Sequence, residues 1–458
     1  MAQLHLHNTL HNDVQLFTPQ DESHVRMYVC GPTVYGPVHI GNARPAAVFD
    51  LLYRLLKRHY PKVTYARNIT DIDDKIINTA AKNGELPETL AKHWHARYSE
   101  NMQQLGVLPP DEEPLATAYM PQIINMIERL LQQNVAYAAE GHVLFHVPAF
   151  SDYGQLSNRK RDDMIAGARV EVAPYKKDPA DFILWKPSKD DVPGWESPWG
   201  RGRPGWHIEC SAMAESCLGK EIDIHGGGQD LIFPHHENEL AQSRCAHNTP
   251  HFARFWVHNG HVRMDGEKMS KSLNNVLLLQ DILAHYDGET ARLALFSTHY
   301  RRPLNWTASV LADAKATLDK WYRVLAAGDV ADSNCNSDCE VVEKMLLDDL
   351  NTPAAIAELH QLAHNAQHAD DAQTAAAWRG QLKSGAQLLG LLNHDVEEWF
   401  HGAGKQLPQD AQIEEKINQR LAARAARDFA AADAIRDELA ALGILLEDTA
   451  DGTTWRIK

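Results

Sequence analysis

The sequence predicts an α/β protein in which a Rossmann-type domain with a parallel sheet is split by an insertion and followed by an α-helical region and a small C-terminal α/β module. Three observations support this prediction. Strand, loop, helix and strand patterns follow one another between residues 25 and 70. Residues 148–204 are dense in Pro, Gly, Asp and Trp and interrupt the pattern before strand signals resume. From residue 275 onward, Ala- and Leu-rich helical patterns dominate.

The first strand, loop, helix and strand form one βαβ unit. Residues 25–29 have the period of two expected of a strand, and Gly31-Pro32 ends it. Pro45 suits a first helical turn, apolar residues continue at helical spacing to Pro61, and residues 63–70 predict the second strand. In a right-handed βαβ unit the ligand site lies beyond the carboxyl ends of the strands, so we expect it at the loop after the first strand.

That loop carries His39-Ile40-Gly41-Asn42. Gly41 lets the backbone approach a ligand closely, the helix amino terminus offers free N–H groups to phosphate, and His39 can donate to phosphate oxygens. Taken alone, the tetrapeptide is more simply interpreted as a βα turn with a solvated histidine. A second motif, Gly266-Glu267-Lys268-Met269-Ser270-Lys271-Ser272, lies much later in the chain, and taken alone its Lys-x-x-Lys is likewise more simply interpreted as a solvated loop. Its two lysines can stabilise the negative charge that grows on phosphate oxygens during phosphoryl chemistry.

The remaining elements of the first two thirds follow in chain order. Helical patterns cover 88–105 and 120–133, and residues 141–147 predict a strand. A Rossmann-type fold should continue directly with the next strand and helix, so the Pro- and Gly-rich stretch predicts a connective insertion. The second half resumes at Trp206 with these expected elements: a short helix over 211–218, a strand over 221–225, a glycine run, a helix from about 235 to 246 and a strand over 252–257.

The C-terminal third is expected to be mainly helical. Helical patterns cover 289–296, 310–325, 340–350, 353–392 and 411–441. Asp451-Gly452 lies between two short strand patterns, 444–447 and 453–457, and predicts a terminal hairpin. The predicted domains are the first half of the Rossmann-type domain at 1–118, the insertion at 119–205, the second half at 206–305, a helical domain at 306–405 and the small α/β module at 406–458.

Composition limits the class of protein. The chain has 458 residues, and its 44% hydrophobic content is enough for several packed cores. No apolar run approaches the ~18 residues of a membrane span, and the N-terminal segment lacks the apolar core of a signal peptide, so we expect a cytoplasmic protein without a membrane partner. The net charge of −16 argues against a polyanionic partner except where basic residues cluster locally. Six cysteines are too few and too irregular for a disulfide framework, and Cys335 and Cys339 are interpreted as plain thiols.

The two motifs, in that order, resemble the HIGH and KMSKS signatures of class I aminoacyl-tRNA synthetases. Five longer blocks resemble cysteinyl-tRNA synthetases: YVCGPTVY at 28–35, RNITDIDDK at 67–75, GWHIECSAM at 205–213, HGGGQDL at 225–231 and FPHHENE at 233–239. The resemblance is specific from about residue 20 to 310 and looser to Lys458. Asn42 departs from the signature, which has its second histidine there. Because asparagine can donate a hydrogen bond but cannot carry charge, the resemblance implies the backbone geometry at Asn42 and not a charged role.

The resemblance implies an ATP-dependent ligase with the class I Rossmann-type fold. L-cysteine and ATP, with Mg²⁺, would give cysteinyl adenylate and pyrophosphate, and the 3′-terminal ribose hydroxyl of tRNA(Cys) would take the acyl group. Catalytic roles are implied for His39, Lys268 and Lys271. ATP-binding roles are implied for His39, Gly41, Asn42, Gly228, Asp230 and Lys271, and binding of the amino acid is implied for Thr70, Asp73, Trp206 and His225. From the residues alone, Trp206 suits core packing equally well, and Gly226-Gly227-Gly228 can also be a sharp turn.

The resemblance also implies one Zn²⁺ ion, with Cys30, Cys210, His235 and Glu239 as its ligands. The predicted topology agrees, because Cys30 ends the first strand, Cys210 opens the second half, and His235 and Glu239 are i and i+4 on one helix face. A thiol ionises on a metal far more readily than an alcohol, so direct coordination would select cysteine over serine, where shape alone gives roughly 1–3 kcal/mol. An editing domain is then unnecessary.

Contacts with tRNA are implied for the C-terminal parts. The resemblance places the helical domain on the acceptor side and residues 411–458 at the anticodon end. Arg420, Arg424 and Arg427 lie at i, i+4 and i+7 of a predicted helix, and Arg159-Lys160-Arg161 forms another basic cluster. A solvated helix face and a charged loop explain these clusters equally well. The resemblance implies a monomer.

Two other functions are compatible with parts of the sequence. The amino-sugar ligase of the mycothiol pathway shares the adenylation core, but it would not need the roughly 150 residues that follow the helical junction here. A non-catalytic paralogue could bind nucleotide or RNA, but it would not need His39, both motif lysines and all four implied zinc ligands together. Cysteine-dependent pyrophosphate exchange and charging of tRNA distinguish the three.

Overall fold

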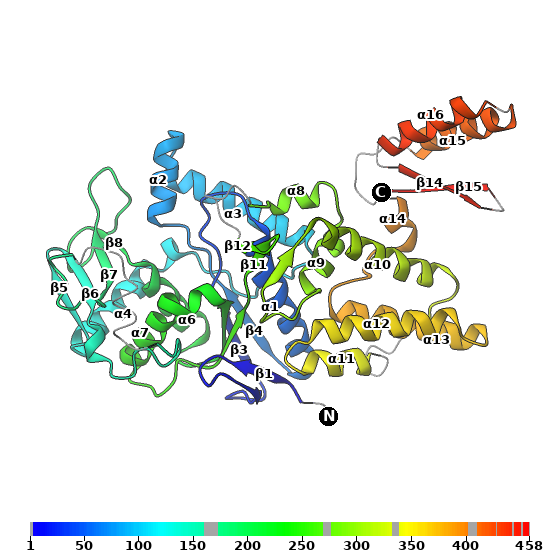
Figure 1. Ribbon diagram of the computed structural model, residues 1–458. Coiled ribbons are helices and arrows are strands. Elements are labelled where there is room, and N and C mark those ends of the chain that lie inside the picture. The colour runs from blue at the N-terminus through cyan, green and yellow to red at the C-terminus, as the bar shows by residue number, and fades with distance from the viewer. Residues whose placement is uncertain are drawn as a thin grey trace. The chain divides into compact units, whose positions relative to one another are not determined.

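The computed structural model of the chain (Figure 1) describes residues 3–159, 173–268, 276–331, 339–401, 410–426, 428–441, 444–449 and 452–457. Its residues form two compact units. Unit 1 comprises Met1–Ala316, Asn334–Gln361 and Ser384–Leu391, and unit 2 comprises Thr317–Ser333, Leu362–Lys383 and Leu392–Lys458. Helices α10 (Ala308–Ala326), α12 (Thr352–Gln367) and α13 (Ala372–Leu388) contribute residues to both units.

Unit 1 is built on a four-stranded parallel sheet, as predicted. Its strands are β3 (Val25–Val29), β4 (Val63–Arg67), β9 (Ile222–Gly228) and β10 (Ala253–Asn259), in the order β10-β9-β3-β4. Met27, in the middle of β3, pairs with Tyr65 of β4 and Ile224 of β9. Tyr28 is fully buried, as are Val25 and Met27 on the opposite face, because both faces of a parallel sheet are usually covered. The two halves of the domain therefore meet at the pair β3 and β9.

Helix α1 (Ile40–His59) joins β3 to β4 and begins earlier than predicted. We expected Pro45 in its first turn, but Pro45 lies in the second turn. The first turn of the helix is held by a side chain of that turn and by a later segment of the chain. Asn42 Oδ1 accepts from the backbone N–H of His39 at 3.4 Å, and the Ile40 N–H donates to the Leu277 carbonyl at 3.0 Å.

The insertion between the two halves forms an antiparallel sheet, seen at the left of Figure 1. Its strands, β5 (Ala136–Ala139), β6 (His142–Phe145), β7 (Phe182–Pro187) and β8 (Gly202–Pro204), pair in that order. Only β6 was predicted. The strand β5 lacks apolar–polar alternation, and β8 is short and contains a proline, so neither has the pattern on which a strand prediction rests. The predicted helix at 120–133 is α4 (Met120–Gln132), which follows the short turn η1 (Ala116–Tyr119), and η2 (Val147–Ala149) follows β6.

The second half differs from the prediction at two places. Helix α6 (Trp206–Leu218) begins at Trp206, ahead of the predicted start at 211. Strand β9 continues through Gly226, Gly227 and Gly228, so the interpretation of this run as a sharp turn is wrong. A Cβ on Gly226 would lie 2.2 Å from Phe49 Cε1 of α1, and one on Gly227 would lie 2.9 Å from His236 Cε1. The glycines thus let α1 and His236 pack directly on the strand.

The other elements of unit 1 surround the parallel sheet. Strands β1 (His5–Asn8) and β2 (Asp13–Leu16) form an N-terminal hairpin that the sequence did not predict, and the His7 N–H donates to Asp349 Oδ1 at 2.8 Å. Strands β11 (Val262–Met264), β12 (Glu267–Lys268) and β13 (Leu304–Trp306) form a further sheet in the order β12-β11-β13. The remaining helices and turns are α2 (Asp74–Asn83), α3 (Pro87–Gln104), η3 (Gln229–Leu231), η4 (Ile232–His236), α7 (Glu237–His247), α8 (Leu279–Leu283), α9 (Gly288–Phe296) and α11 (Glu340–Leu347).

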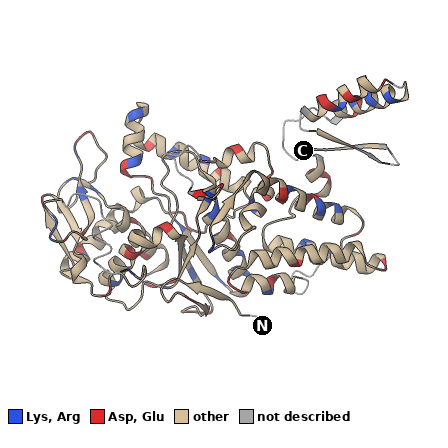
Figure 2. Cartoon of the chain, in the orientation of Figure 1, with Lys and Arg blue, Asp and Glu red and all other residues tan. Residues whose placement is uncertain are grey.

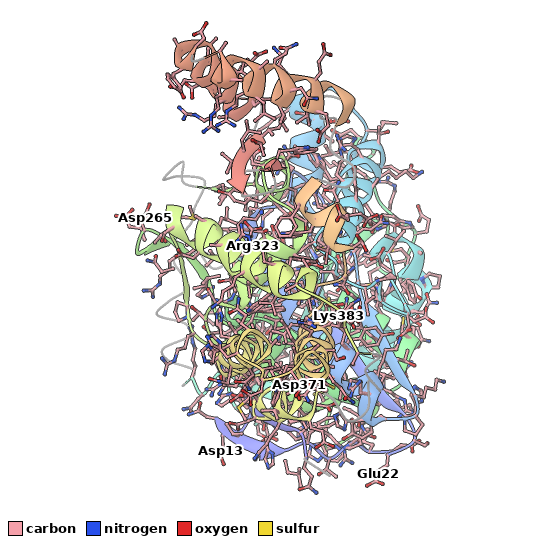
Figure 3. All side chains as sticks on the ribbon, turned by 90° about the vertical axis from the view of Figure 1, so that its right-hand side faces the viewer. Asp13, Glu22, Asp265, Arg323, Asp371 and Lys383 are labelled. Carbon is pink, nitrogen blue, oxygen red and sulfur yellow. The ribbon has the colours of Figure 1, made fainter. Side chains whose placement is uncertain are left out.

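Two helices, α12 and α13, replace the single helix that was predicted over 353–392. Asp371, labelled in Figure 3, accepts hydrogen bonds from the Thr374 N–H at 2.8 Å and from the Thr374 hydroxyl at 2.9 Å. An aspartate that accepts from the first turn in this way starts a new helix. The prediction over 353–392 rested on the spacing of apolar residues, and it therefore missed Asp371 as the start of a second helix.

The C-terminal module lies in unit 2. Helix α14 (Val396–His401) precedes the module, whose elements are α15 (Asp410–Ala425), α16 (Phe429–Ala441), β14 (Ile444–Thr449) and β15 (Gly452–Ile457). The antiparallel pairing of β14 with β15 confirms the predicted hairpin, and Ile413, Ile417, Leu439, Ile444 and Trp455 form the core. Figure 2 shows that α15 and α16 each carry both basic and acidic residues. Of the helices in the described ranges, none is long and apolar enough to cross a membrane.

Candidate active site

A cavity of about 380 Å³ opens where β3, β9 and β10 end and α1 begins. Its wall includes His39, Gly41 and Asn42 at the start of α1, and Gly228 and Asp230 after β9. These are the predicted ATP-binding residues other than Lys271, which falls outside the residues described. Residues 29–38, from the end of β3 onward, and residues 259–262, between the end of β10 and the start of β11, also line the cavity. The cavity thus combines a helix N-terminus, which attracts anions, with a wall of closely packed backbone.

Four side chains that the sequence suggested as metal ligands meet at this cavity. Cys30 follows β3 and lines the cavity, Cys210 lies on α6, His235 in η4 and Glu239 in the first turn of α7. Their ligand atoms all lie within 4.8 Å of one another. The two sulfurs are 3.8 Å apart, and Glu239 Oε1 lies 3.4 Å from the Cys30 sulfur and 3.0 Å from His235 Nε2. Two thiols, an imidazole and a carboxylate are donors that Zn²⁺ prefers, so the set fits that ion.

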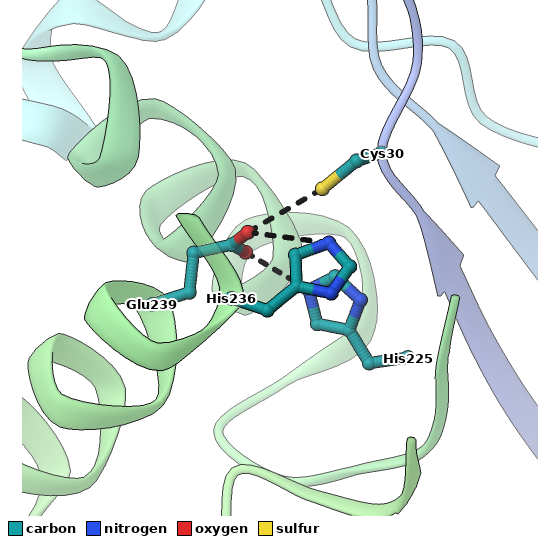
Figure 4. Close-up of side chains that lie close together, drawn as sticks. All are labelled: Cys30, His225, His236 and Glu239. Carbon is teal, nitrogen blue, oxygen red and sulfur yellow. Dashed lines mark hydrogen bonds and ion pairs between the residues drawn. The ribbon is translucent and has the colours of Figure 1, made fainter. Parts of the chain in front are cut away.

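A second group of side chains overlaps the first. The ligand atoms of Cys30, His225, His236 and Glu239 also lie within 4.8 Å of one another (Figure 4). His225 Nε2 lies 2.9 Å from Glu239 Oε2, and His236 Nδ1 lies 2.8 Å from His258 Nε2. Because His225 engages Oε2, it can orient Glu239 while Oε1 stays directed at the first group. This geometry favours the first group as the metal-binding set, with His225, His236 and His258 as its support.

Burial and mutual contact set the charges of the cluster. Burial raises the pKa of the Cys30 thiol well above its usual value, whereas the hydrogen bond from Cys30 lowers the pKa of Cys210 to about 6. Burial acts to lower the pKa of His235, but Glu239 and Cys210 bring it to about 10. Burial acts to raise the pKa of Glu239, but His225 and His235 hold it well below its usual value. A thiolate and a carboxylate therefore surround a protonated imidazole, and a divalent cation can replace that proton.

Two residues at the start of α6 contact His235 from another side. The Trp206 and His235 rings are stacked with centroids 4.1 Å apart, and His207 Nδ1 lies 2.9 Å from His235 Nδ1. Trp206 is 39% exposed and lines the cavity, so its interpretation as a core residue is wrong. The sequence reasoning missed His207, although its spacing of three from Cys210 on one helix was an available signal. It also missed His236 and His258; the first adjoins His235, and the second belongs to no motif.

Three residues that were predicted to bind the amino acid lie outside the cavity wall. Thr70 is buried, and its hydroxyl donates to Glu209 Oε2 at 3.4 Å. Asp73 caps α2 by accepting from the Lys75 N–H at 2.7 Å. His225 is fully buried beside Glu239. Of the four residues predicted for this role, Trp206 alone lines the cavity.

Backbone hydrogen bonds join the segment that follows the second motif to the turn that carries the first. Lys268 ends β12 and pairs with Arg263 of β11, while residues 269–275, which include Lys271, are not among those described. After this segment, Leu278 forms a bridge with His39, and the Leu279 N–H donates to the Val38 carbonyl at 2.9 Å. The chain thus returns from the second motif onto the turn that carries the first.

The arginines that were predicted to contact tRNA differ in exposure. Arg420 is 7% exposed, and its Nη1 lies 3.5 Å from Thr453 Oγ1 inside the C-terminal module. Packing against the hairpin therefore covers Arg420, so in this structure it does not extend an exposed basic face. Arg424 is exposed, and Arg427 is beyond the described part of the helix pair. In the other cluster, the Arg159 guanidinium lies 4.8 Å from the Phe233 ring centroid, and residues 160 and 161 are likewise not described.

Comparison with known families gives three matches along the chain. Residues 16–316 match the family described as tRNA synthetases class I (C) catalytic domain. Residues 341–393 match the DALR domain, and residues 410–456 match the cysteinyl-tRNA ligase anticodon binding domain. The first match alone covers more than half of the chain.

Curated relatives are similar over the full length. The cysteine–tRNA ligase of Paramagnetospirillum magneticum is 56% identical over 98% of this chain and 99% of the relative. Those of Rhodospirillum rubrum and Xanthomonas campestris pv. campestris are 55% and 53% identical, each over 99% of both chains.

Solved structures share the fold at low identity. The methionyl-tRNA synthetase of Mycobacterium tuberculosis, solved with methionyl-adenylate, has a TM-score of 0.56 at 12% identity and covers 80% of this chain and 89% of its own. The LeuRS of a LeuRS–tRNA–LeuAMS complex from Agrobacterium radiobacter has a TM-score of 0.59 at 12% identity, with 81% and 84% covered. These likenesses extend to the α/β fold and not to specificity.

Proposed function

The chain belongs to the cysteine–tRNA ligases, a family of class I aminoacyl-tRNA synthetases, and from that premise we propose how its residues divide the charging of tRNA(Cys) among themselves. Such a ligase activates L-cysteine with ATP to cysteinyl adenylate, releases pyrophosphate, and transfers the cysteinyl group to the 3′ end of tRNA(Cys). One observation carries the assignment of roles. The four metal-ligand candidates come together directly behind Cys30, which lines the same cavity as the start of α1.

We place ATP in the cavity with its phosphates against the start of α1. His39, Gly41 and Asn42 line the wall there, where free N–H groups and the helix dipole favour anions. When the cysteine carboxylate attacks the α-phosphate, negative charge grows on the phosphate oxygens and pyrophosphate leaves. His39, Lys268 and Lys271 would donate to these oxygens and neutralise that charge, with Mg²⁺ bound to the ATP. Asn42 needs no charge to shape this turn, because its amide oxygen accepts a hydrogen bond from the His39 N–H.

Cys30, Cys210, His235 and Glu239 would hold one Zn²⁺ ion. When bound, the ion supplies a Lewis acid that stabilises a substrate thiolate in preference to an alcohol. Cys30 lines the cavity, so the set faces the space where the substrate side chain would lie. Trp206 covers His235 at the same wall, and His225 keeps the Glu239 carboxylate oriented. Cysteine is therefore selected by the donor set rather than by shape.

We propose that residues 306–405 contact the acceptor side of tRNA(Cys) and that residues 406–458 contact the anticodon end. The matches to the DALR and anticodon-binding families support this division. Arg424 is exposed on α15 and suits a phosphate contact, whereas Arg420 is covered. We also expect a monomer in a reducing compartment such as the cytoplasm. The described cysteines, including Cys339, are free thiols, as that compartment favours.

The test measures cysteine-dependent exchange of pyrophosphate into ATP and charging of unfractionated tRNA, with serine as competitor. We expect exchange with cysteine and not serine, and charging of one tRNA species. Exchange without charging would instead indicate the amino-sugar ligase. Neither activity, in protein replete with zinc, would indicate a binding-only paralogue.

A further inference from the structure

Arg44 has no part in the roles assigned above, although it follows Asn42 closely on α1. Its side chain is fully buried. Burial lowers the pKa of Arg44 to about 10, so the guanidinium is still charged at neutral pH. No ion pair joins it to a carboxylate within the described ranges, and a buried charge without such a partner requires other polar groups around it.

Four backbone carbonyls supply those groups. Arg44 Nη1 donates to the carbonyls of Gly260 and His261 at 2.7 and 2.9 Å. Arg44 Nη2 donates to those of His299 and Arg302 at 3.3 and 2.7 Å. Gly260 and His261 belong to the wall of the cavity, and His299 and Arg302 bound the turn that leads into β13. One side chain thus ties α1 to two separate backbone segments.

The turn from 299 to 302 is bonded to several segments at once. All four of its carbonyls accept hydrogen bonds: the first and last from Arg44, the second from the Gly260 N–H at 2.8 Å, and the third from Gln229 Nε2 at 3.1 Å. Gln229 stands between two residues of the cavity wall, Gly228 and Asp230. The turn therefore contacts three cavity-lining segments at once: the start of α1, the end of β9 and the end of β10.

The same turn is held from its far side. Asp349 accepts from the Tyr300 hydroxyl at 2.7 Å and from Arg301 Nε at 2.7 Å. On the near side, a Cβ on Gly260 would lie 2.5 Å from the Arg302 carbonyl oxygen, so the two backbones are as close as glycine allows. Asp349 on one side and the Gly260 backbone on the other fix the turn. Arg44 can therefore position α1 relative to it.

We propose that Arg44 is a positioning residue for ATP, which fixes the spacing between the two walls of the cavity by tying both to the 299–302 turn. One wall is the start of α1 with His39, and the other is residues 259–262. The second wall continues through β11 into β12, which ends at Lys268, so Arg44 also sets where the second motif begins relative to the first. The inference rests on the proposed binding of ATP between these walls.

The role requires a guanidinium rather than a positive charge alone. Arginine presents five donors in a fixed plane, and here its two terminal nitrogens each reach two carbonyls. Lysine has one compact ammonium with three donors, so Arg44→Lys keeps the charge but cannot hold both segments. Displacing reacting groups by about 1 Å can reduce the rate on the order of 100-fold.

The experiment compares Arg44→Lys with Arg292→Lys in the full chain. Arg292 is equally buried, on α9, and it also donates to carbonyls, those of Leu389 at 2.5 Å and Gly106 at 3.3 Å, besides its ion pair with Asp50. None of these residues lines the cavity. We expect Arg44→Lys to lower kcat/KM for ATP in pyrophosphate exchange by about 10- to 100-fold, with KM for cysteine within about twofold of the unsubstituted value. We expect Arg292→Lys to lose thermal stability with an unchanged KM for ATP.

Two further measurements keep the inference open to refutation. Ethylguanidinium added to Arg44→Ala should restore part of the ATP-dependent rate. A general structural defect would not be rescued in this way. If Arg44→Lys does not fold, Gln229→Ala cuts a tie to the same turn without removing the buried charge, and we expect a smaller rise in KM for ATP. Unchanged kinetics in Arg44→Lys, equal effects on ATP and cysteine, or an unchanged Gln229→Ala would overturn the inference. Absence of exchange in the unsubstituted protein would instead overturn the proposed function.

Discussion

The metal-ligand cluster and the ATP side of the cavity are built in opposite ways. In the cluster, side chains contact one another directly, and four ligand atoms lie within 4.8 Å. On the ATP side, the wall includes the start of α1, Gly228 at the end of β9, and Gly260 and His261, whose backbone carbonyls accept from Arg44. Donor chemistry depends on residue identity, whereas backbone geometry depends on packing. Substitutions in the cluster should therefore abolish a property, and substitutions on the ATP side should reduce a rate by degrees.

The largest effect is expected from Cys210→Ser. Cys210 is buried and does not line the cavity, so the change replaces one metal donor and leaves the wall intact. We expect loss of bound Zn²⁺, a fall in kcat/KM for cysteine of more than about 100-fold, and loss of the preference over serine. Metal analysis and pyrophosphate exchange measure these quantities.

A control for that change lies on the same helix. Cys217 is half-buried near the Tyr119 hydroxyl, 3.6 Å away, and belongs to neither candidate metal group in the described part of the chain. Cys217→Ser should keep the metal and the activity. A Cys210→Ser protein that retained both zinc and selectivity would show that the cluster is not the metal site.

The next largest effect tests the ATP side. His39→Ala should lower kcat for exchange by about 10²- to 10³-fold, because it removes a donor to the developing charge. The zinc content and the cysteine–serine preference should stay the same, since His39 belongs to neither metal group of the described residues. Loss of zinc in this variant would show that the ATP side and the metal-ligand cluster do not act independently. His11→Ala, at an exposed site, is the control and should be unchanged.

A smaller effect is expected in the support of the cluster. His225→Phe keeps a ring that can stack on Trp256, as His225 does at 4.7 Å, but it removes the Nε2 contact with Glu239. We expect zinc affinity to fall by about 10- to 100-fold, because Glu239 loses its orientation. Titration with a competing chelator measures the affinity. An unchanged affinity would mean that the histidines behind Glu239 only fill space.

Gly226→Ala should act on stability rather than chemistry. Its Cβ would lie 2.2 Å from Phe49 Cε1, so the buried Phe49 ring, the strand or α1 must shift, at a cost of about 1–3 kcal/mol. The matched control is Gly36→Ala, where no atom lies within 4 Å of the added Cβ. Denaturant unfolding of both variants gives the comparison. Equal stability of the two variants would show that the strand can yield at Gly226.

The smallest effect concerns a site remote from both regions. Hydrogen bonds from His59 and Arg58 lower the pKa of Glu343 to about 2. Because this pKa is below the unfolded value of about 4.3, the carboxylate stabilises the fold above that pH, and the contribution is lost as the pH falls toward 2. Glu343→Gln should therefore be less stable at pH 7, with a difference that shrinks in acid. Denaturant midpoints across this range measure it, and a difference independent of pH would contradict the assignment.

The parallel sheet and the metal-ligand candidates could be predicted because their signals are local. Apolar periodicity marks β3 and β10. Cys30, Cys210, His235 and Glu239 were implied by the resemblance to cysteinyl-tRNA synthetases, which short blocks of sequence carry. The hairpin β1–β2 and the strands β5, β7 and β8 could not, because short strands take their identity from distant pairing partners. Arg44 and the Arg302 carbonyl that it holds are 258 residues apart, so no sequence pattern joins them.

The N-terminal hairpin has a consequence for synthesis of the chain on the ribosome. The His7 N–H bonds to Asp349, 342 residues later, and Thr9, just after β1, lies 2.7 Å from His258, which contacts His236 of the cluster. At about 5–20 residues per second, Asp349 is translated on the order of 20 to 70 s after His7. A nascent chain that has reached Glu239 already contains all four candidate ligands. Asp349, which accepts from the N–H of His7 in the supporting hairpin, is translated about a hundred residues later.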